Sequence, residues 1–143
     1  MMGALADGVL DAGGRIRSVL IEGFLPVAHP EVQVVTVAGS MRERKHDLLE
    51  GSQACVALPG GIGTFDEIFE VLSLTQLQIT VVPLVLLDHG RYFQPLLELL
   101  DRTIETGYVR AADRSLFEMV EKVEQVVPAL RNWRVPQIPD KKG

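Results

Sequence analysis

The chain has 143 residues, of which 47% are hydrophobic and 6% aromatic, and its net charge at pH 7 is −5. This length fits one domain with its own core, and the aliphatic composition is typical of an α/β protein. The negative charge argues against a general nucleic-acid-binding surface, because contact with a phosphate backbone needs a basic footprint.

The only cysteine, Cys55, stands in an apolar run and cannot form an internal disulfide, which is typical of the reducing cytoplasm. No apolar run is long enough to span a bilayer. The N-terminus lacks the basic-then-apolar pattern of a secretory signal. We therefore expect a cytoplasmic protein with neither a nucleic acid nor a membrane as its partner.

Apolar periodicity and turn residues divide the chain into alternating helices and short strands. The expected helices cover 2–10, 41–51, 64–77, 92–106 and 121–132, and Pro128 interrupts or bends the last of them. The expected strands cover 15–21, 32–37, 54–58, 83–88 and 115–120. Such alternation predicts an α/β fold with a doubly wound parallel sheet covered on both faces. We expect one domain over 1–133 and a polar, proline-rich extended tail over 134–143.

The third expected strand leads into a glycine-rich run, 59–64 (PGGIGT), and then into a helix. Glycines at positions 60, 61 and 63 exceed what a tight turn needs, although a turn without a ligand remains the simpler alternative. Backbone N–H groups and a helix N-terminus can converge there on an anion, usually a phosphate. The run has neither the Gly-Lys-Ser/Thr ending of a Walker A loop nor the spacing of the dinucleotide fingerprint.

Two interpretations of Glu67 stay open on spacing alone. Thr64 and Glu67 form the pattern T-x-x-E, which is a capping box at the start of a helix. In that case Glu67 only bonds a backbone N–H group and contributes about 1 kcal/mol. Alternatively, Glu67 points into the phosphate-side cleft as a catalytic carboxylate.

A second motif, which is basic, follows the second expected strand and is expected at the same edge of the sheet as the glycine-rich run. Ser40 and Glu43 form an S-x-x-E capping box, so Glu43 is expected to be structural. Arg42, Arg44 and Lys45 lie in the first turns, where the helix dipole disfavours cations. Their placement indicates a bound anion, and a solvated basic face is the alternative. Ligands of such sheets bind beyond the carboxyl ends of the strands, where both motifs lie.

The histidines at 29, 46 and 89 lack metal-ligand spacing, and no cysteine pair supports them, so we predict no metal. On spacing alone, Asp66 and Glu70 are first-turn partners of the helix dipole or solvated charges.

The two motifs together resemble the LONELY GUY (LOG) family of cytokinin riboside 5'-monophosphate phosphoribohydrolases, long mislabelled as lysine decarboxylases. Their patterns are M-x-x-R-K, here 41–45 (MRERK), and P-G-G-x-G-T-x-x-E, here 59–67 (PGGIGTFDE). Further similarity extends the resemblance from Met2 to about Val127. It implies a Rossmann-like fold, a homodimer, no cofactor, and hydrolysis of the N-glycosidic bond of AMP or a prenylated AMP to free base and ribose 5-phosphate.

The resemblance also implies roles for individual residues. Arg44 and Glu67 match the family's catalytic arginine and glutamate. We expect the phosphate and ribose to be bound by Met41, Lys45, Gly60, Gly61, Ile62, Gly63, Thr64 and Asp66.

This chain departs from the family pattern at two places. Leu74 and Gln78 stand where the family often has a tryptophan and a glycine. The chain also opens on a helix, which resembles the family's helix after an upstream glycine-rich loop. We therefore expect an N-terminally truncated sheet that lacks a strand–helix–strand unit of about 40 residues or more. Such a chain would be compensated by oligomerisation or partner pairing, or would be weakly active.

Two other functions compete with hydrolysis. A non-catalytic nucleotide-binding protein would use a similar glycine loop, and it would not need Glu67. A lysine decarboxylase would need a Schiff-base lysine for pyridoxal phosphate, and Lys45 is better explained as a phosphate ligand.

Overall fold

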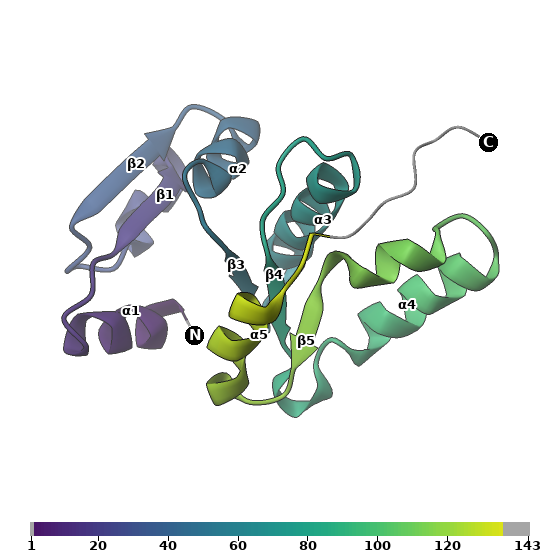
Figure 1. Cartoon of the computed structure of the whole chain (residues 1–143). Coiled ribbons are helices and arrows are strands. Elements are labelled where there is room, and N and C mark those ends of the chain that lie inside the picture. The colour runs from purple at the N-terminus through teal and green to yellow at the C-terminus, as the bar shows by residue number, and fades with distance from the viewer. Residues whose placement is uncertain (1, 136–143) are drawn as a thin grey trace. The chain divides into compact units, whose positions relative to one another are not determined.

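The structure is a computed structural model that describes residues 2–135, and all its paired strands are parallel (Figure 1). Parallel strands joined through helices confirm the predicted α/β class. The chain divides into two compact units, Met1–Gly51 and Ser52–Gly143. Of the expected tail over 134–143, only the first two residues lie among those described.

The first unit is built around two parallel strands. Its elements are α1 (Met2–Asp11), β1 (Arg17–Ile21), the 3-10 helix η1 (Glu22–Val27), β2 (Val34–Ala38) and α2 (Met41–Leu49). Helix α2 packs against both strands. Gly13, with φ of +73°, follows the end of α1, which lies one residue beyond the predicted helix over 2–10.

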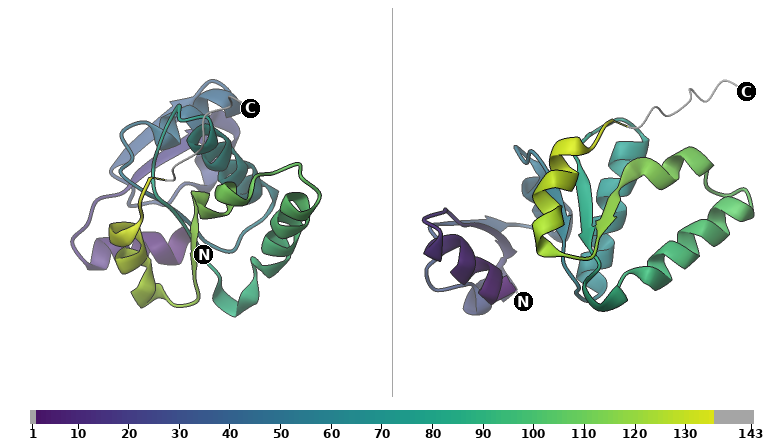
Figure 2. Two further views of the ribbon diagram at one scale, coloured as in Figure 1. Left: turned by 45° about the vertical axis from the view of Figure 1, so that its right-hand side comes forward. Right: turned by 60° about the horizontal axis from the view of Figure 1, so that its bottom comes forward.

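The second unit contains a three-stranded parallel sheet in the order β3-β4-β5. Its main elements are β3 (Cys55–Ala57), α3 (Ile62–Gln76), β4 (Leu84–Leu87), α4 (Gln94–Glu105), β5 (Glu118–Val120) and α5 (Val126–Asn132). Three short 3-10 helices complete it: η2 (His89–Arg91), η3 (Ala111–Leu116) and η4 (Val123–Gln125). Figures 1 and 2 show α5 on one face of this sheet and α3 on the other.

The core of the second unit is formed by the central strand and the helix before it. All four residues of β4 are buried, as expected for a parallel strand covered on both faces. Helix α3 buries Ile68, Val71, Leu72 and Thr75, which recur at the three- and four-residue spacing of one helix face. No helix within residues 2–135 has the length and apolar character that crossing a bilayer requires.

The strands and helices lie close to their predicted positions, with three corrections. Helix α3 begins at Ile62, two residues before the predicted start at Thr64. The predicted helix over 121–132 is divided into η4 and α5, and Pro128 is the third residue of α5. A proline in the first turn removes no intrahelical hydrogen bond, so it neither interrupts nor bends α5. The predicted strand over 115–120 begins only at Glu118, because Ser115 belongs to η3.

Candidate functional site

The glycine loop connects the carboxyl end of β3 to the first turn of α3. Gly61 is the N-cap residue of this helix, with φ of −86° and ψ of −160°, and no side chain caps the helix. The helix geometry leaves the N–H groups of Ile62 and Gly63 without an intrahelical acceptor. These donors and the positive end of the helix dipole make the start of α3 suitable for an anion.

The three glycines of the loop have different surroundings. A Cβ atom on Gly60 would lie 2.3 Å from Oγ1 of Thr64, so the close packing of the loop itself requires a glycine there. A Cβ atom on Gly61 or Gly63 would meet nothing within 4 Å. The loop is therefore tight at Gly60 and open at Gly61 and Gly63, where a ligand could approach the backbone closely.

The start of α3 tests the capping box predicted for Thr64 and Glu67. Because Gly61 is the N-cap, Thr64 lies inside the first turn, and its N–H group donates to the Gly61 carbonyl at 3.0 Å. The predicted capping box of Thr64 and Glu67 is therefore wrong.

Glu67 is half-buried and lies one helical turn after Gly63. Residues four apart share a face of a helix, so Glu67 projects from the face on which Gly63 is open. Burial raises the pKa of the Cys55 thiol on β3, and the negative charge of Glu67 raises it further. The Glu67 carboxylate is thus within electrostatic reach of β3, whereas Asp66 is exposed.

In the first unit, Ser40 caps α2 as predicted. Its Oγ accepts a hydrogen bond from the Glu43 N–H group at 3.1 Å. The Glu43 carboxylate accepts one from the Gly39 N–H group at 2.8 Å, so it satisfies a backbone donor just before the helix. These bonds confirm a structural role for Glu43.

Arg44 is held against the neighbouring strand. Its Nε donates to the backbone carbonyl of Val19 on β1 at 3.0 Å, and the side chain is half-buried. A guanidinium group has five N–H donors in a fixed plane, and this bond uses one of them. Lys45 is also half-buried, while Met41 and Arg42 are exposed.

The predicted site residues fall into two groups, one in each unit. Met41, Arg44 and Lys45 lie on α2, which follows the carboxyl end of β2. The others follow the carboxyl end of β3, and they are Gly60, Gly61, Ile62, Gly63, Thr64, Asp66 and Glu67. The structure brings the residues together within each group.

Sequence reasoning did not assign a role to Tyr92, whose hydroxyl donates a hydrogen bond to the Gly60 carbonyl. Tyr92 follows β4, the strand that pairs with β3. The carboxyl ends of adjacent parallel strands share one edge, which is the signal that points to this residue.

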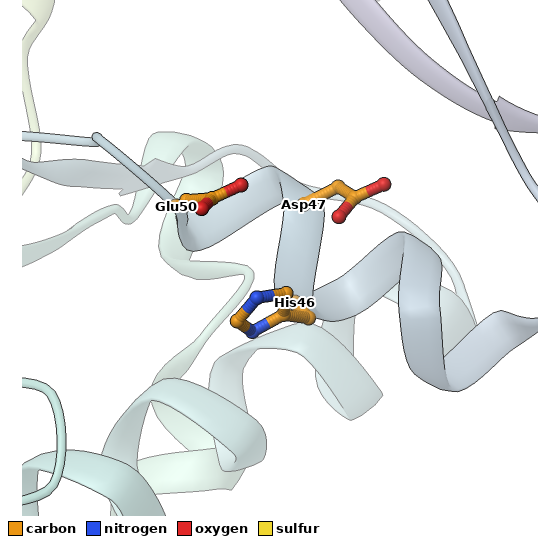
Figure 3. A group of neighbouring side chains, drawn as sticks. All are labelled: His46, Asp47 and Glu50. Carbon is orange, nitrogen blue, oxygen red and sulfur yellow. The ribbon is translucent and has the colours of Figure 1, made fainter.

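A group of possible metal ligands among residues 2–135 lies at the end of α2 (Figure 3). One ligand atom from each of His46, Asp47 and Glu50 lies within 4.8 Å of the others, and His46 and Glu50 are exposed. Atoms that share a zinc ion are about 3.3 Å apart, since each is about 2 Å from the metal. These side chains would have to turn toward one another to share an ion, so we assign no metal to them.

Comparison with known proteins agrees with the resemblance of the two motifs. Residues 2–130 match the family described as "Possible lysine decarboxylase". The chain is 35% identical over 135 residues to the "Cytokinin riboside 5'-monophosphate phosphoribohydrolase" of Rhodococcoides fascians. That alignment covers 92% of this chain and 68% of the relative.

Plant proteins with related names are similar to the same extent. A "Probable cytokinin riboside 5'-monophosphate phosphoribohydrolase" of Oryza sativa subsp. japonica is 35% identical, with 90% of this chain and 60% of the relative covered. A "Cytokinin riboside 5'-monophosphate phosphoribohydrolase" of Arabidopsis thaliana is 29% identical, with 96% and 72% covered. The chain thus spans 56 to 60% of the length of several rice relatives. It belongs to the family described as possible lysine decarboxylases, which is the LOG family.

Proposed function

We propose that the protein hydrolyses the N-glycosidic bond of a purine nucleoside 5'-monophosphate and releases the free base and ribose 5-phosphate. The observation that carries this proposal is the start of α3. There the open backbone at Gly61 and Gly63 and the N–H donors of the first turn suit a phosphate. The half-buried Glu67 lies one turn later, on the same helix face as Gly63. The names of the relatives support the same reaction.

The 5'-phosphate would bind the loop from Gly60 to Thr64. The resemblance to the family supports Lys45 on α2 as a further phosphate ligand. Ile62 and Gly63 would contribute backbone N–H groups and the positive end of the helix dipole. A phosphate held in this way anchors the substrate, and this binding energy is present in both the ground state and the transition state.

Glu67 would act at the sugar. Cleavage of the glycosidic bond places positive charge on the ribose ring in an oxocarbenium-like transition state. The Glu67 carboxylate can stabilise that charge, and it can also accept a proton from the attacking water. Water supplies the hydroxyl group of ribose 5-phosphate and a proton that reaches the base, so the reaction consumes one water molecule and needs no cofactor.

Arg44 would bind phosphate or ribose oxygens through its planar donors. Its bond to the Val19 carbonyl limits the orientations of the guanidinium. This restriction favours a role in oriented hydrogen bonds to the ligand over a role through charge attraction alone. Met41 and Asp66, both exposed, are the remaining proposed contacts to the ligand.

The substrate that we propose is AMP or a prenylated AMP, and the relatives named for cytokinin riboside 5'-monophosphate support the prenylated form. We also propose that residues 1–133 act together as one nucleotide-binding domain. Resemblance to the family supports a homodimer.

The test is to incubate the purified chain with AMP and, separately, with isopentenyladenosine monophosphate, and to measure the base and ribose 5-phosphate by chromatography. Equal molar amounts of the two products would support the proposal, and the relative rates would rank the bases. A chain that binds these nucleotides but releases no base would be a nucleotide-binding protein instead of a hydrolase.

A further inference from the structure

The glycine loop is held by a side chain from the connection that follows the neighbouring strand β4. The Tyr92 hydroxyl donates to the Gly60 carbonyl, although Tyr92 follows β4 and Gly60 follows β3. This hydrogen bond joins two connections at the carboxyl edge of the sheet.

The bond fixes the orientation of one peptide group. In a trans peptide the carbonyl and the following N–H group point in opposite directions. With the Gly60 carbonyl directed to Tyr92, the Gly61 N–H group points away from Tyr92, in the opposite direction within the peptide plane. Glycine rotates easily about φ and ψ, so without such a bond the peptide between Gly60 and Gly61 could turn over.

The ring of Tyr92 is itself held in place by two other aromatic rings. It stacks on Phe65 in the first turn of α3, with ring centroids 6.2 Å apart and an interplanar angle of 20°. It also meets Phe93 edge to face, with centroids 5.1 Å apart. Phe93 is fully buried, so the ring is anchored to the core even though Tyr92 is 40% exposed.

The connection that presents Tyr92 has a constrained backbone. Gly90 and Arg91 have φ values of +66° and +62°, and the left-handed conformation is unfavourable for a side chain such as that of Arg91. The buried carboxylate of Asp88 accepts the Phe93 N–H group at 2.6 Å and also accepts a hydrogen bond from the Gln94 amide. Strain that the surrounding structure maintains is a feature of functional sites.

We propose that Tyr92 is a positioning residue for the anion-binding loop: its hydroxyl holds the peptide between Gly60 and Gly61 in the orientation that binds the phosphate of the substrate. This inference rests on the proposed function for the identity of the phosphate ligand. Tyr92 touches the loop and not the reacting atoms. Its effect therefore falls on phosphate binding, which is the same in the ground state and the transition state.

The test uses Tyr92→Phe, which keeps the ring and its stacking and removes only the hydroxyl. The matched control is Tyr108→Phe, because Tyr108 is 89% exposed and is the other tyrosine of the chain. The affinity for ribose 5-phosphate is measured by calorimetry, KM and kcat are measured with AMP, and stability is measured by thermal unfolding.

We expect Tyr92→Phe to weaken ribose 5-phosphate binding and raise KM by about five- to tenfold, with kcat little changed and Tyr108→Phe equal to the wild type. A Tyr92→Phe protein that unfolds at a lower temperature but binds ribose 5-phosphate like the wild type would overturn the inference, because its hydroxyl would then be merely structural. A wild-type chain that binds ribose 5-phosphate but cleaves no nucleotide would refute the hydrolase alone, and the calorimetric comparison would still decide the role of Tyr92.

Discussion

Gly63 and Glu67 lie one turn apart on the same face of α3, so an open stretch of backbone and a half-buried carboxylate occur side by side at the start of one helix. The open backbone suits an anion, and the carboxylate suits a centre that becomes positively charged in the reaction. A nucleoside monophosphate undergoing loss of its base offers both, with the phosphate and the reacting carbon on one ribose.

Replacement of Gly63 by alanine separates the fold from the site. Gly63 is a helical residue whose Cβ would meet nothing, so Gly63→Ala is expected to stabilise the chain by about 0.5–1 kcal/mol. The added methyl group would occupy the space of the bound phosphate and weaken ribose 5-phosphate binding by about tenfold or more. Thermal unfolding and calorimetry measure the two effects.

The matched control for that experiment is Gly8→Ala. Gly8 lies inside α1 and its Cβ would also meet nothing within 4 Å. This variant should gain stability and keep the affinity of the wild type. If Gly63→Ala behaved in the same way as Gly8→Ala, the open side of the glycine loop would not be the phosphate site.

Arg44→Lys keeps the charge but loses the planar donor that binds the Val19 carbonyl. We expect a loss of about 1 kcal/mol in the free energy of unfolding and a fall in kcat/KM of about tenfold or more. Arg42→Lys, at an exposed position two residues earlier, should change neither quantity. Equal kcat/KM for the two variants would show that charge alone is needed at Arg44.

Gln78→Gly should stabilise the protein. Gln78 has φ of +56° just after α3, where the Ile79 N–H group donates to the Leu74 carbonyl and the Gln78 N–H group to the Thr75 carbonyl. This pattern ends a helix with a left-handed residue, usually glycine. We expect a gain of about 1 kcal/mol from Gln78→Gly and a smaller gain from Gln78→Asn. If the wild type unfolded at a higher temperature than both Gln78→Gly and Gln78→Asn, this explanation would be contradicted.

The thiol of Cys55 reports on the charge of Glu67. Burial and the Glu67 carboxylate raise the pKa of Cys55 above its ordinary value of 9.0. Only the thiolate reacts with iodoacetamide, so the rate of alkylation should reach its midpoint above pH 9.0. Glu67→Gln removes a negative charge that disfavours the thiolate, and it should therefore shift the midpoint to lower pH.

Glu70→Gln is the control for the alkylation experiment, because Glu70 is on the same helix but does not contribute to the pKa shift of Cys55. Its alkylation profile should match that of the wild type. An unchanged profile in Glu67→Gln would mean that the Glu67 carboxylate does not face β3.

The sequence predicted most elements because their signals are local. The apolar β-branched strands and the Ser40 cap are read from neighbouring residues, and both were confirmed. The start of α3 was misplaced because the T-x-x-E pattern at Thr64 is a stronger local signal than a glycine N-cap. Gly61 adopts the extended conformation that an N-cap needs. Because a glycine can adopt many other conformations, its presence in the sequence does not predict this one.

The contacts that hold the candidate site in place could not be predicted in the same way. The hydrogen bonds of Tyr92 with Gly60 and of Arg44 with Val19 join residues that are 32 and 25 positions apart. Such contacts depend on which strands become neighbours. They are therefore visible only once the strand order is known.

The most direct test of the proposed chemistry is to compare Glu67→Gln with Glu70→Gln in the release of base from AMP, alongside calorimetry with ribose 5-phosphate. Loss of a carboxylate that acts in the transition state should lower kcat by about a hundredfold or more, with ribose 5-phosphate affinity unchanged and Glu70→Gln fully active. Full turnover by Glu67→Gln would contradict the role of Glu67 as the catalytic carboxylate. A Glu67→Gln protein that loses both turnover and the binding of ribose 5-phosphate would contradict it as well.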